Sequence, residues 1–505
     1  MSDTFSLIAG GAAYLFNVNN ILLLVLGTLI GLIAGSIPGL SSSNTTAIIL
    51  PMTLGMSMDG ALVFLGAIYV ACQYGGSIPA ILVNTPGTSG ACATTLDGYP
   101  LAQQGKATFA LGISLTASSV GGMISAAIAL LIMRPAALMA FKFGPAEVFL
   151  LALVGIVIIV SASEKEIAKG LLAGTIGLLI ATMSADPTLG RPRLTFGLME
   201  LYDQIPLIPA LVGLFAFPSL ISLLGEASVS RVVNNKIGDL TQVLQGAAFT
   251  FRHWGNLLRS SLIGLFIGIV PGSGIDVASF MSYGQAKIWS KHPETFGKGN
   301  PEGVLAPEAS NNSVVAGALV PSIALGIPGS TTAAIMLAAL TMHGINPGPS
   351  VMRMFPNEVY AVFLSVLLSN FLLWPFGFVY TRLVSKLSLT NTAYLIPAIF
   401  TICMIGSLAT RNFILDMYMF LIFGILGYIM TENGFPVVPL ILGIVMGSIA
   451  EENFIVAFHL SRESFGIFFA NPITWILWVV IIAALVGPSI INRVHRRKQG
   501  KDNSV

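Results

Sequence analysis

Long apolar runs with few charges constrain this chain more than any other feature of its sequence. Charged residues make up 9% of the 505 residues and hydrophobic residues 55%, whereas a soluble domain carries roughly 25% charged residues. Because one helical span needs about 20 apolar residues, the chain has room for roughly 10 to 14 membrane crossings. The apolar runs do not alternate with period two, which favours helices over a closed barrel. The predicted fold class is an all-α polytopic membrane protein.

Two parts of the sequence share a pattern of glycine and proline. Residues 31–39 read GLIAGSIPG and residues 264–272 read GLFIGIVPG, so both follow GLxxGxxPG. A second pair of motifs follows in the same order, NTPGT at 84–88 and GIPGSTT at 326–332. Several matched motifs in one order predict two homologous repeats. We expect the repeats to be inverted with respect to each other.

The matched motifs divide the chain into four predicted parts. The first membrane repeat covers 1–225 and a connecting loop or surface helix covers 226–253. The second repeat, with additional helices, covers 254–492. Residues 493–505 form a basic tail after an apolar run, and the positive-inside rule predicts that this C-terminus is cytoplasmic. The N-terminus lacks a basic region typical of a signal peptide, so we expect the first span to be retained.

Proline-glycine pairs inside apolar segments predict interrupted helices. Proline lacks an amide hydrogen and glycine adopts backbone angles closed to other residues, so such a pair ends a helix. The freed backbone groups are tolerated in a membrane only where protein or a water-filled cavity satisfies them. Interrupted helices at matching places in two repeats mark the binding site of many transporters. We expect broken helices in both halves, with re-entrant segments near 41–58 and 276–288.

The polar run SSSNTT at 41–46 follows the first Pro-Gly pair and is unfavourable to bury without partners. Its hydroxyls and amides suit a carboxylate, and a helix beginning near Asn44 would point free amides at the site. The alternative is an ordinary helix N-cap. The candidate substrate-binding residues are Gly39, Ser42, Ser43, Asn44, Thr45, Asn84, Thr85, Pro86, Gly87, Thr88, Gly329, Ser330 and Thr331.

The matching position after the second Pro-Gly pair carries a carboxylate, Asp276, where the first half has Ser43. An ionisable residue inside a membrane indicates function, and a negative charge suits a cation rather than an anionic substrate, so we expect Asp276 to couple an ion if it is buried. For Glu308 the alternative is that it only complements a helix N-terminus. The candidate ion-coupling residues are Pro38, Gly272, Ser273, Gly274, Asp276, Glu308, Asn311 and Pro328. The coupling ion is Na⁺, held by carbonyls of the broken helices, or H⁺.

The sequence lacks the motifs of common enzyme and metal sites. No HExxH, Walker loop or GxSxG occurs, and the five histidines and three cysteines have no metal-ligand spacing. We therefore expect neither an enzyme nor a bound cofactor. The net charge of +2 gives no reason to expect a nucleic-acid partner.

The same motifs resemble the large permease subunit of the tripartite tricarboxylate transporter family. The resemblance covers nearly the whole chain and is weakest over the first 20 residues and the C-terminal quarter. The segments that carry it are 31–40, 74–78, 84–88, 97–100, 105–107, 196–197, 271–274, 302–304, 306–308, 311–312 and 325–329.

The resemblance implies a bacterial inner-membrane importer of carboxylates that an ion gradient drives. It also implies two partners, a small four-helix membrane subunit and a periplasmic solute-binding protein that delivers the substrate. Citrate, other di- or tricarboxylates, and aromatic or sugar acids all remain open as substrates. The alternatives from other classes are a stand-alone anion channel and an intramembrane enzyme.

Overall fold

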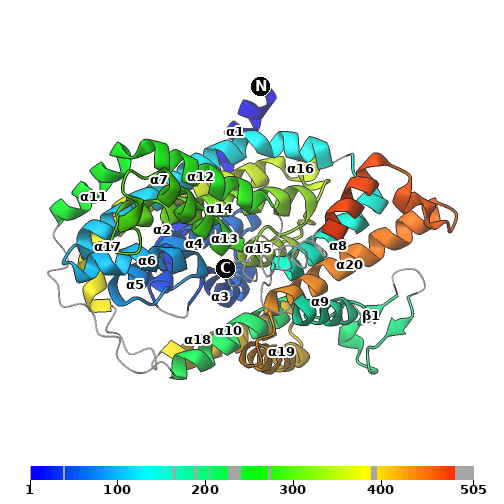
Figure 1. The fold of residues 1–505 in the computed structure, drawn as a ribbon. Helices are drawn as coiled ribbons and strands as arrows, with labels where there is room; N and C mark the ends of the chain where they lie inside the picture. The colour runs from blue at the N-terminus through cyan, green and yellow to red at the C-terminus, as the bar shows by residue number, and fades with distance from the viewer. Residues whose placement is uncertain are drawn as a thin grey trace, which may run out of the picture. The chain divides into compact units, whose positions relative to one another are not determined.

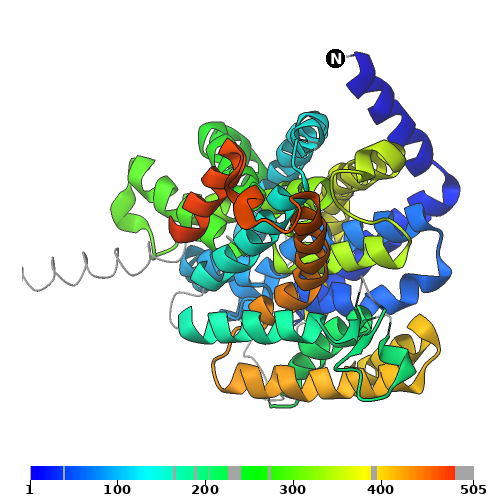
Figure 2. The same cartoon turned by 90° about the vertical axis from the view of Figure 1, so that its right-hand side faces the viewer.

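Helices make up almost all of the structure, as the two views of the ribbon show (Figure 1 and Figure 2). Within the part of the chain that the structure describes, the strands are β1 (Ser184–Ala185) and β2 (Pro192–Arg193), which form one short antiparallel pair. The prediction of an all-helical protein is confirmed. The computed structural model describes residues 2–37, 40–140, 142–162, 167–186, 190–202, 204–225, 240–270, 274–387 and 395–483.

The helices follow one another with short connections. The α-helices are α1 (Ser2–Leu15), α2 (Val18–Gly35), α3 (Ser42–Ile49), α4 (Met58–Gly75), α5 (Ser77–Val83), α6 (Cys92–Gln103), α7 (Ala107–Ala140), α8 (Pro145–Ala162), α9 (Ile167–Ala181), α10 (Leu207–Gly225), α11 (Leu240–Arg252), α12 (Trp254–Ile269), α13 (Gly274–Trp289), α14 (Glu302–Leu325), α15 (Thr331–Met342), α16 (Val351–Met354), α17 (Pro356–Leu387), α18 (Leu395–Arg411), α19 (Ile414–Glu432) and α20 (Val437–Leu460). Short 3₁₀ helices are η1 (Leu50–Gly55), η2 (Ser89–Ala91), η3 (Met199–Leu201), η4 (Pro293–Thr295) and η6 (Phe465–Phe469).

Six of the described helical segments are long and apolar enough to cross a membrane, which agrees with a multi-pass membrane protein. Eight further apolar helices of 10 to 17 residues occur among the described residues. The number of membrane crossings therefore stays a prediction, because it depends on which of the shorter helices span the membrane alone and which span it only together with a neighbouring helix. The six long segments are Val18–Gly35, Met58–Val83, Ala107–Met139, Pro356–Thr381, Ile414–Glu432 and Val437–Leu460.

The chain forms two compact units. Unit 1 contains Met1–Leu138 and Ile208–Tyr428, and unit 2 contains Met139–Leu207 and Ile429–Val505. Within unit 2, α20 packs against α8 and α9. Gly177 of α9 lies against the carbonyl oxygen of Leu440 in α20, where no Cβ atom would fit. All residues of the candidate site belong to unit 1.

Glycines of the first GLxxGxxPG motif allow α2 to pack closely along α4, and the two helices lie side by side in Figure 1. A Cβ atom on Gly31 would lie 2.6 Å from the carbonyl oxygen of Ile68. Gly35, one turn later, lies in the same way against Cys72. Small residues at such positions let membrane helices approach through their backbones.

Glycines of the second GLxxGxxPG motif allow α12 to pack closely along α14. Gly264 lies against the carbonyl oxygen of Ser310, and a Cβ atom on Gly268 would lie 2.8 Å from the carbonyl oxygen of Val314. The matched sequence patterns thus make the same kind of helix contact in two places. Each contact supports one of the two interrupted helices described next.

Candidate functional site

The first interruption of a helix, which we call the first break, covers residues 84–88. After a bend at Gly76, α4 continues as α5, which ends at Asn84 in the left-handed conformation (φ 57°). The amide of Thr85 donates to the carbonyl of Pro79 at 3.3 Å, and that of Gly87 donates to Gly76 at 2.9 Å. The chain then turns through η2 into α6.

The second break covers residues 326–330 and has the same construction. Helix α14 ends at Gly326, which is left-handed (φ 74°), and the amide of Ile327 donates to the carbonyl of Pro321 at 3.4 Å. Ser330 caps the next helix, α15, by accepting a hydrogen bond from the amide of Ala333 at 3.2 Å. Left-handed residues end both helices in the manner of a common C-cap.

Each break lies against the end of a glycine-rich helix. Gly87 sits on the carbonyl oxygen of Gly35 in α2, and Gly329 sits on that of Gly268 in α12, with no room for a Cβ atom in either case. The Pro-Gly pairs that follow these two helices were predicted to take part in the site. Their residues Pro38, Gly39, Pro271, Gly272 and Ser273 lie outside the described residues.

The polar run after α2 forms the start of a helix. Helix α3 begins at Ser42 rather than near Asn44, so the predicted start was two residues late. Ser41 is the N-cap, because its hydroxyl accepts from the amide of Asn44 at 3.2 Å. Ser43 bonds to Ser41 at 2.9 Å. The capping alternative thus accounts for Ser41 and Ser43.

Ser42 connects α3 to the second break. Its hydroxyl lies 2.9 Å from that of Thr332 and accepts from the side-chain amide of Gln73 at 3.1 Å. Beside this pair, the hydroxyl of Tyr69 lies 2.6 Å from that of Ser330. Ser42, Tyr69, Gln73 and Thr332 are all buried. A residue beside the first Pro-Gly pair is therefore bonded to the break of the other half of the chain.

Asp276 makes the reciprocal connection. It lies in the first turn of α13, after the left-handed Gly274 (φ 77°), and accepts a hydrogen bond from the hydroxyl of Ser89. The amide oxygen of Asn311, on α14, lies against Gly90. The side chain of Asp276 is exposed, so the burial on which its ion-coupling role was predicted to depend is not found. The start of α13 thus meets the first break, just as the start of α3 meets the second.

Other predicted residues have different surroundings. The side-chain amide of Asn44 donates to Ser219 of α10, and Thr45 lies 3.7 Å from the sulfur of Cys72. Asn84 is exposed, Thr85 is half-buried and Thr88 is buried. Glu308 is fully buried on α14.

Several buried oxygen atoms near the breaks have no hydrogen-bond partner among the described residues. They are the side-chain oxygens of Gln73, Thr88 and Asn311. Oxygen ligands of this kind suit hard cations. The described residues contain no cluster of three or more His, Cys, Asp or Glu side chains that would hold a transition metal.

Sequence reasoning did not single out Tyr69, Gln73, Ser89 or Thr332. Gln73 is the residue that could have been found, because an amide within an apolar span of 26 residues needs a partner. Tyr69 gave no such signal, because tyrosine is common in apolar helices. Ser89 directly follows the motif at 84–88 and Thr332 is the last residue of the motif at 326–332, so their positions could be found but not their partners.

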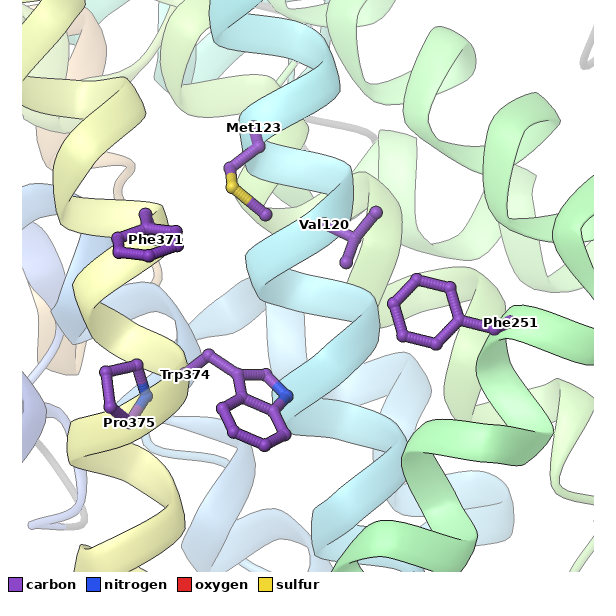
Figure 3. A pocket seen from close by; sticks show the side chains of 6 residues that line it. All are labelled: Val120, Met123, Phe251, Phe371, Trp374 and Pro375. Carbon is purple, nitrogen blue, oxygen red and sulfur yellow. The ribbon is translucent and has the colours of Figure 1, made fainter.

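A pocket elsewhere in unit 1 differs in character from the breaks. Figure 3 shows it between α7, α11 and α17, and none of its lining side chains carries a charge or a hydroxyl. The indole N–H of Trp374, a donor among the lining side chains, already donates to Thr116 at 3.2 Å, so the pocket is poorly suited to a carboxylate and is not part of the candidate site. The lining residues are Val120, Met123, Phe251, Phe371, Trp374 and Pro375.

Interrupted helices that bring polar groups together inside an apolar, multi-pass chain are typical of membrane transporters. The family comparison agrees and is more specific. The chain belongs to the tripartite tricarboxylate transporter TctA family, whose sequence profile matches residues 21–442. It is a transporter subunit and not an enzyme.

Two relatives come from Agrobacterium vitis. One, described as an uncharacterized 52.8 kDa protein in the TAR-I ttuC' 3' region, is 33% identical over 486 residues, and the match covers 96% of each chain. Another, an uncharacterized protein in the TAR-II ttuC' 3' region, is 36% identical over 231 residues, which cover 45% of this chain and 95% of the relative. No solved structure matches.

Proposed function

We propose that this chain is the large transmembrane subunit of an importer of carboxylate anions, driven by an ion gradient. Its partners are a small four-helix membrane subunit and a periplasmic solute-binding protein, and it acts in the bacterial inner membrane. Membership of the TctA family over residues 21–442 carries this proposal. The absence of any nucleotide-binding motif from the sequence agrees with an ion gradient as the energy source.

The substrate carboxylate binds to neutral donors at the two breaks. Thr85 and Thr88 supply hydroxyls at the first break, and Ser330 and Thr331 supply them at the second. Helix α15 starts at Thr331, so its free amides and its dipole favour an anion there. Among the described contacts of these residues there is no lysine or arginine. Neutral donors hold an anion without requiring a buried positive charge.

The coupling ion binds beside the first break. The carboxylate of Asp276 and the unpaired oxygens of Thr88 and Asn311 support this placement. The left-handed Gly274 lets the chain turn sharply before Asp276. Because most of these groups are neutral oxygens, Na⁺ suits them better than H⁺.

The two halves are inverted repeats, and each contributes one break to the proposed substrate site. Matched glycine contacts of α2 and α12, matched left-handed residues at Asn84 and Gly326, and crossed side-chain contacts support this proposal. Broken helices in two repeats that face one another form one site in many secondary transporters.

Transport by the reconstituted complex tests the proposed function. Proteoliposomes that contain both membrane subunits, with the binding protein outside, should accumulate a labelled carboxylate above its external concentration under an imposed Na⁺ gradient. Accumulation should collapse when the gradient is dissipated and should not respond to ATP. Passive equilibration of the label would instead indicate a channel, and chemical conversion of it would indicate an enzyme.

Replacing Asp276 tests the ion site. Asp276→Asn should raise the Na⁺ concentration for half-maximal transport by roughly tenfold or more, because a charged ligand of the ion is lost. The substrate KM at saturating Na⁺ should change much less. Glu294→Gln, which alters an exposed carboxylate beside His292, is the matched control. An unchanged Na⁺ dependence in Asp276→Asn would remove Asp276 from the ion site.

A further inference from the structure

A buried carboxylate on α14 is held by an unusual set of donors. Glu308 is completely buried, and hydroxyl groups from three other helices donate to its two oxygens. No lysine, arginine or histidine is among its described partners. The donors to Oε1 are Ser77, at 2.6 Å, and Thr94, and the donors to Oε2 are Ser114, at 3.0 Å, and Ser118, at 2.8 Å.

The number of donors matches the acceptor capacity of the group. A carboxylate has about four lone-pair sites, and four hydroxyls occupy them. A coupling cation would have to displace one of these donors in order to bind. The sequence placed Glu308 among the candidate ion-coupling residues, but its surroundings suit a different role.

We propose that Glu308 is a positioning residue that fixes the first break against α14, an inference that rests on the proposed function. Ser77 is the first residue of α5, which leads into the break, and Thr94 is on α6, which leads out of it. Glu308 therefore bonds to both arms of the first break. Ser114 and Ser118, one turn apart on α7, complete the set from the opposite side.

A second buried carboxylate holds the same arm further along. Asp97, three residues after Thr94 on α6, accepts 2.7 Å hydrogen bonds from the amides of Gly299 and Asn300, which precede α14. The hydroxyl of Tyr283 donates to its other oxygen at 2.9 Å. Gly303 lies so close to Asp97 that no Cβ atom would fit. Each helix thus contributes one carboxylate to the contact. Glu308 of α14 bonds to Thr94 of α6, and Asp97 of α6 bonds to the residues that precede α14.

Fixing both arms fixes the groups between them. Thr85 and Thr88 lie in the break, and they bind a carboxylate well only if their hydroxyls are already oriented toward it. Glu308 is well suited to hold this segment because one side chain bonds to both arms, through Ser77 and Thr94. Its effect on substrate is indirect, since it contacts the arms and not the ligand.

The test uses Glu308→Gln in the full complex with both partner subunits. The amide can accept fewer hydrogen bonds than the carboxylate, so at least one hydroxyl loses its acceptor. We expect hydrogen exchange of residues 84–91 to accelerate about tenfold and the substrate KM to rise about tenfold. Maximal rate and Na⁺ half-saturation should stay within about twofold of the unaltered protein. Glu302→Gln is the matched control, because Glu302 lies on the same helix and bonds to Ser290 and Asn256 rather than to the arms.

The opposite pattern would overturn the proposal. If Glu308→Gln shifts Na⁺ half-saturation while exchange of 84–91 and the substrate KM stay unchanged, Glu308 belongs to the coupling site. If Glu308→Gln does not fold, Ser114→Ala and Ser118→Ala, which each remove one donor to Glu308, take its place. Hydrogen exchange of residues 84–91, the substrate KM and Na⁺ half-saturation are then measured in these variants. Hydrogen exchange needs no transport, so it decides the positioning role even if the unaltered complex moves no carboxylate and the proposed function fails.

Discussion

The two breaks have the same backbone construction but differ in what holds them. Carboxylates anchor the arms of the first break, Glu308 through hydroxyls and Asp97 through backbone amides. The second break is held by pairs of neutral hydroxyls, Tyr69 with Ser330 and Ser42 with Thr332. Among the described residues, no carboxylate bonds to residues 326–330 or to α15. Glu308 itself lies on α14, the arm that leads into the second break, so its hydrogen bonds join that arm to both arms of the first break.

This difference separates two properties that a sequence motif does not distinguish. Glycine and proline determine where a helix is interrupted, because they decide which backbone angles and contacts are possible. The partners of the flanking side chains determine how firmly the interruption is held. Since one carboxyl group bonds to both arms of the first break, whereas separate pairs of hydroxyls hold the second, we expect the second break to open more readily than the first.

The largest expected effect is one that both breaks share. Gly87→Val and Gly329→Val each force side-chain atoms into the carbonyl oxygen of a neighbouring helix, Gly35 or Gly268. Overpacking of this kind destabilises a protein by about 1–3 kcal/mol, and here it should also remove most transport activity. Thermal unfolding in detergent and uptake by proteoliposomes measure the two effects.

A control on α13 separates crowding from the change of residue type. A Cβ atom on Gly284 would meet no atom within 4 Å, so Gly284→Val should retain most transport. If only one of the two break variants loses activity, the two breaks do not have the same backbone construction, which contradicts the starting point of the comparison.

The next effect distinguishes the breaks by their mobility. In the unaltered protein, residues 326–331 should exchange amide hydrogens about tenfold faster than residues 84–91, which corresponds to about 1.4 kcal/mol less free energy of opening. A saturating carboxylate should slow exchange at the second break more than at the first. Peptide-level mass spectrometry of the complex in lipid nanodiscs measures both rates. Faster exchange at the first break than at the second would mean that the first break, and not the second, opens more readily.

Much of the fold followed from the sequence because it depends on local chemistry. Apolar runs predicted the all-helical class, and the two GLxxGxxPG motifs fall on α2 and α12. The two breaks also fall where Asn84 and Gly326 end their helices. Each of these features needs only the residues of one segment and the rules for its backbone. The close contact of the motif glycines with carbonyls of neighbouring helices was not predicted.

Partners distant in sequence could not be predicted in this way. The hydroxyl of Ser42 bonds to Thr332, 290 residues away, and the carboxylate of Glu308 bonds to Ser77, 231 residues away. Nothing near Ser77 or Ser114 indicates that a carboxylate lies opposite, because serine in an apolar helix also bonds to its own backbone. The sequence therefore predicted some of the polar residues at the breaks, such as Ser42 and Ser330, but missed Tyr69 and Gln73 and could not indicate which residues hold the others.

The smallest expected effect is a difference in substrate KM between variants of two residues at the start of α3, Ser42 and Asn44. Ser42→Ala removes the hydroxyl that bonds to Thr332 and to Gln73. A neutral hydrogen bond contributes about 0.5–1.5 kcal/mol, so looser packing at the second break should raise the substrate KM about threefold to tenfold.

Asn44→Ala, by contrast, removes a hydrogen bond to Ser219 of α10, and should change the substrate KM by less than about threefold, because Ser219 is not among the proposed substrate-binding residues. Thr401→Ala is the control for both, since the hydroxyl of Thr401 bonds to the carbonyl of Pro397 in its own helix. Initial uptake rates over a range of carboxylate concentrations give the KM of each variant. A rise of tenfold or more in Asn44→Ala, with Ser42→Ala unchanged, would mean that Asn44 contacts the substrate directly, as the polar run by itself suggested, and that its contact with α10 is broken when the substrate binds.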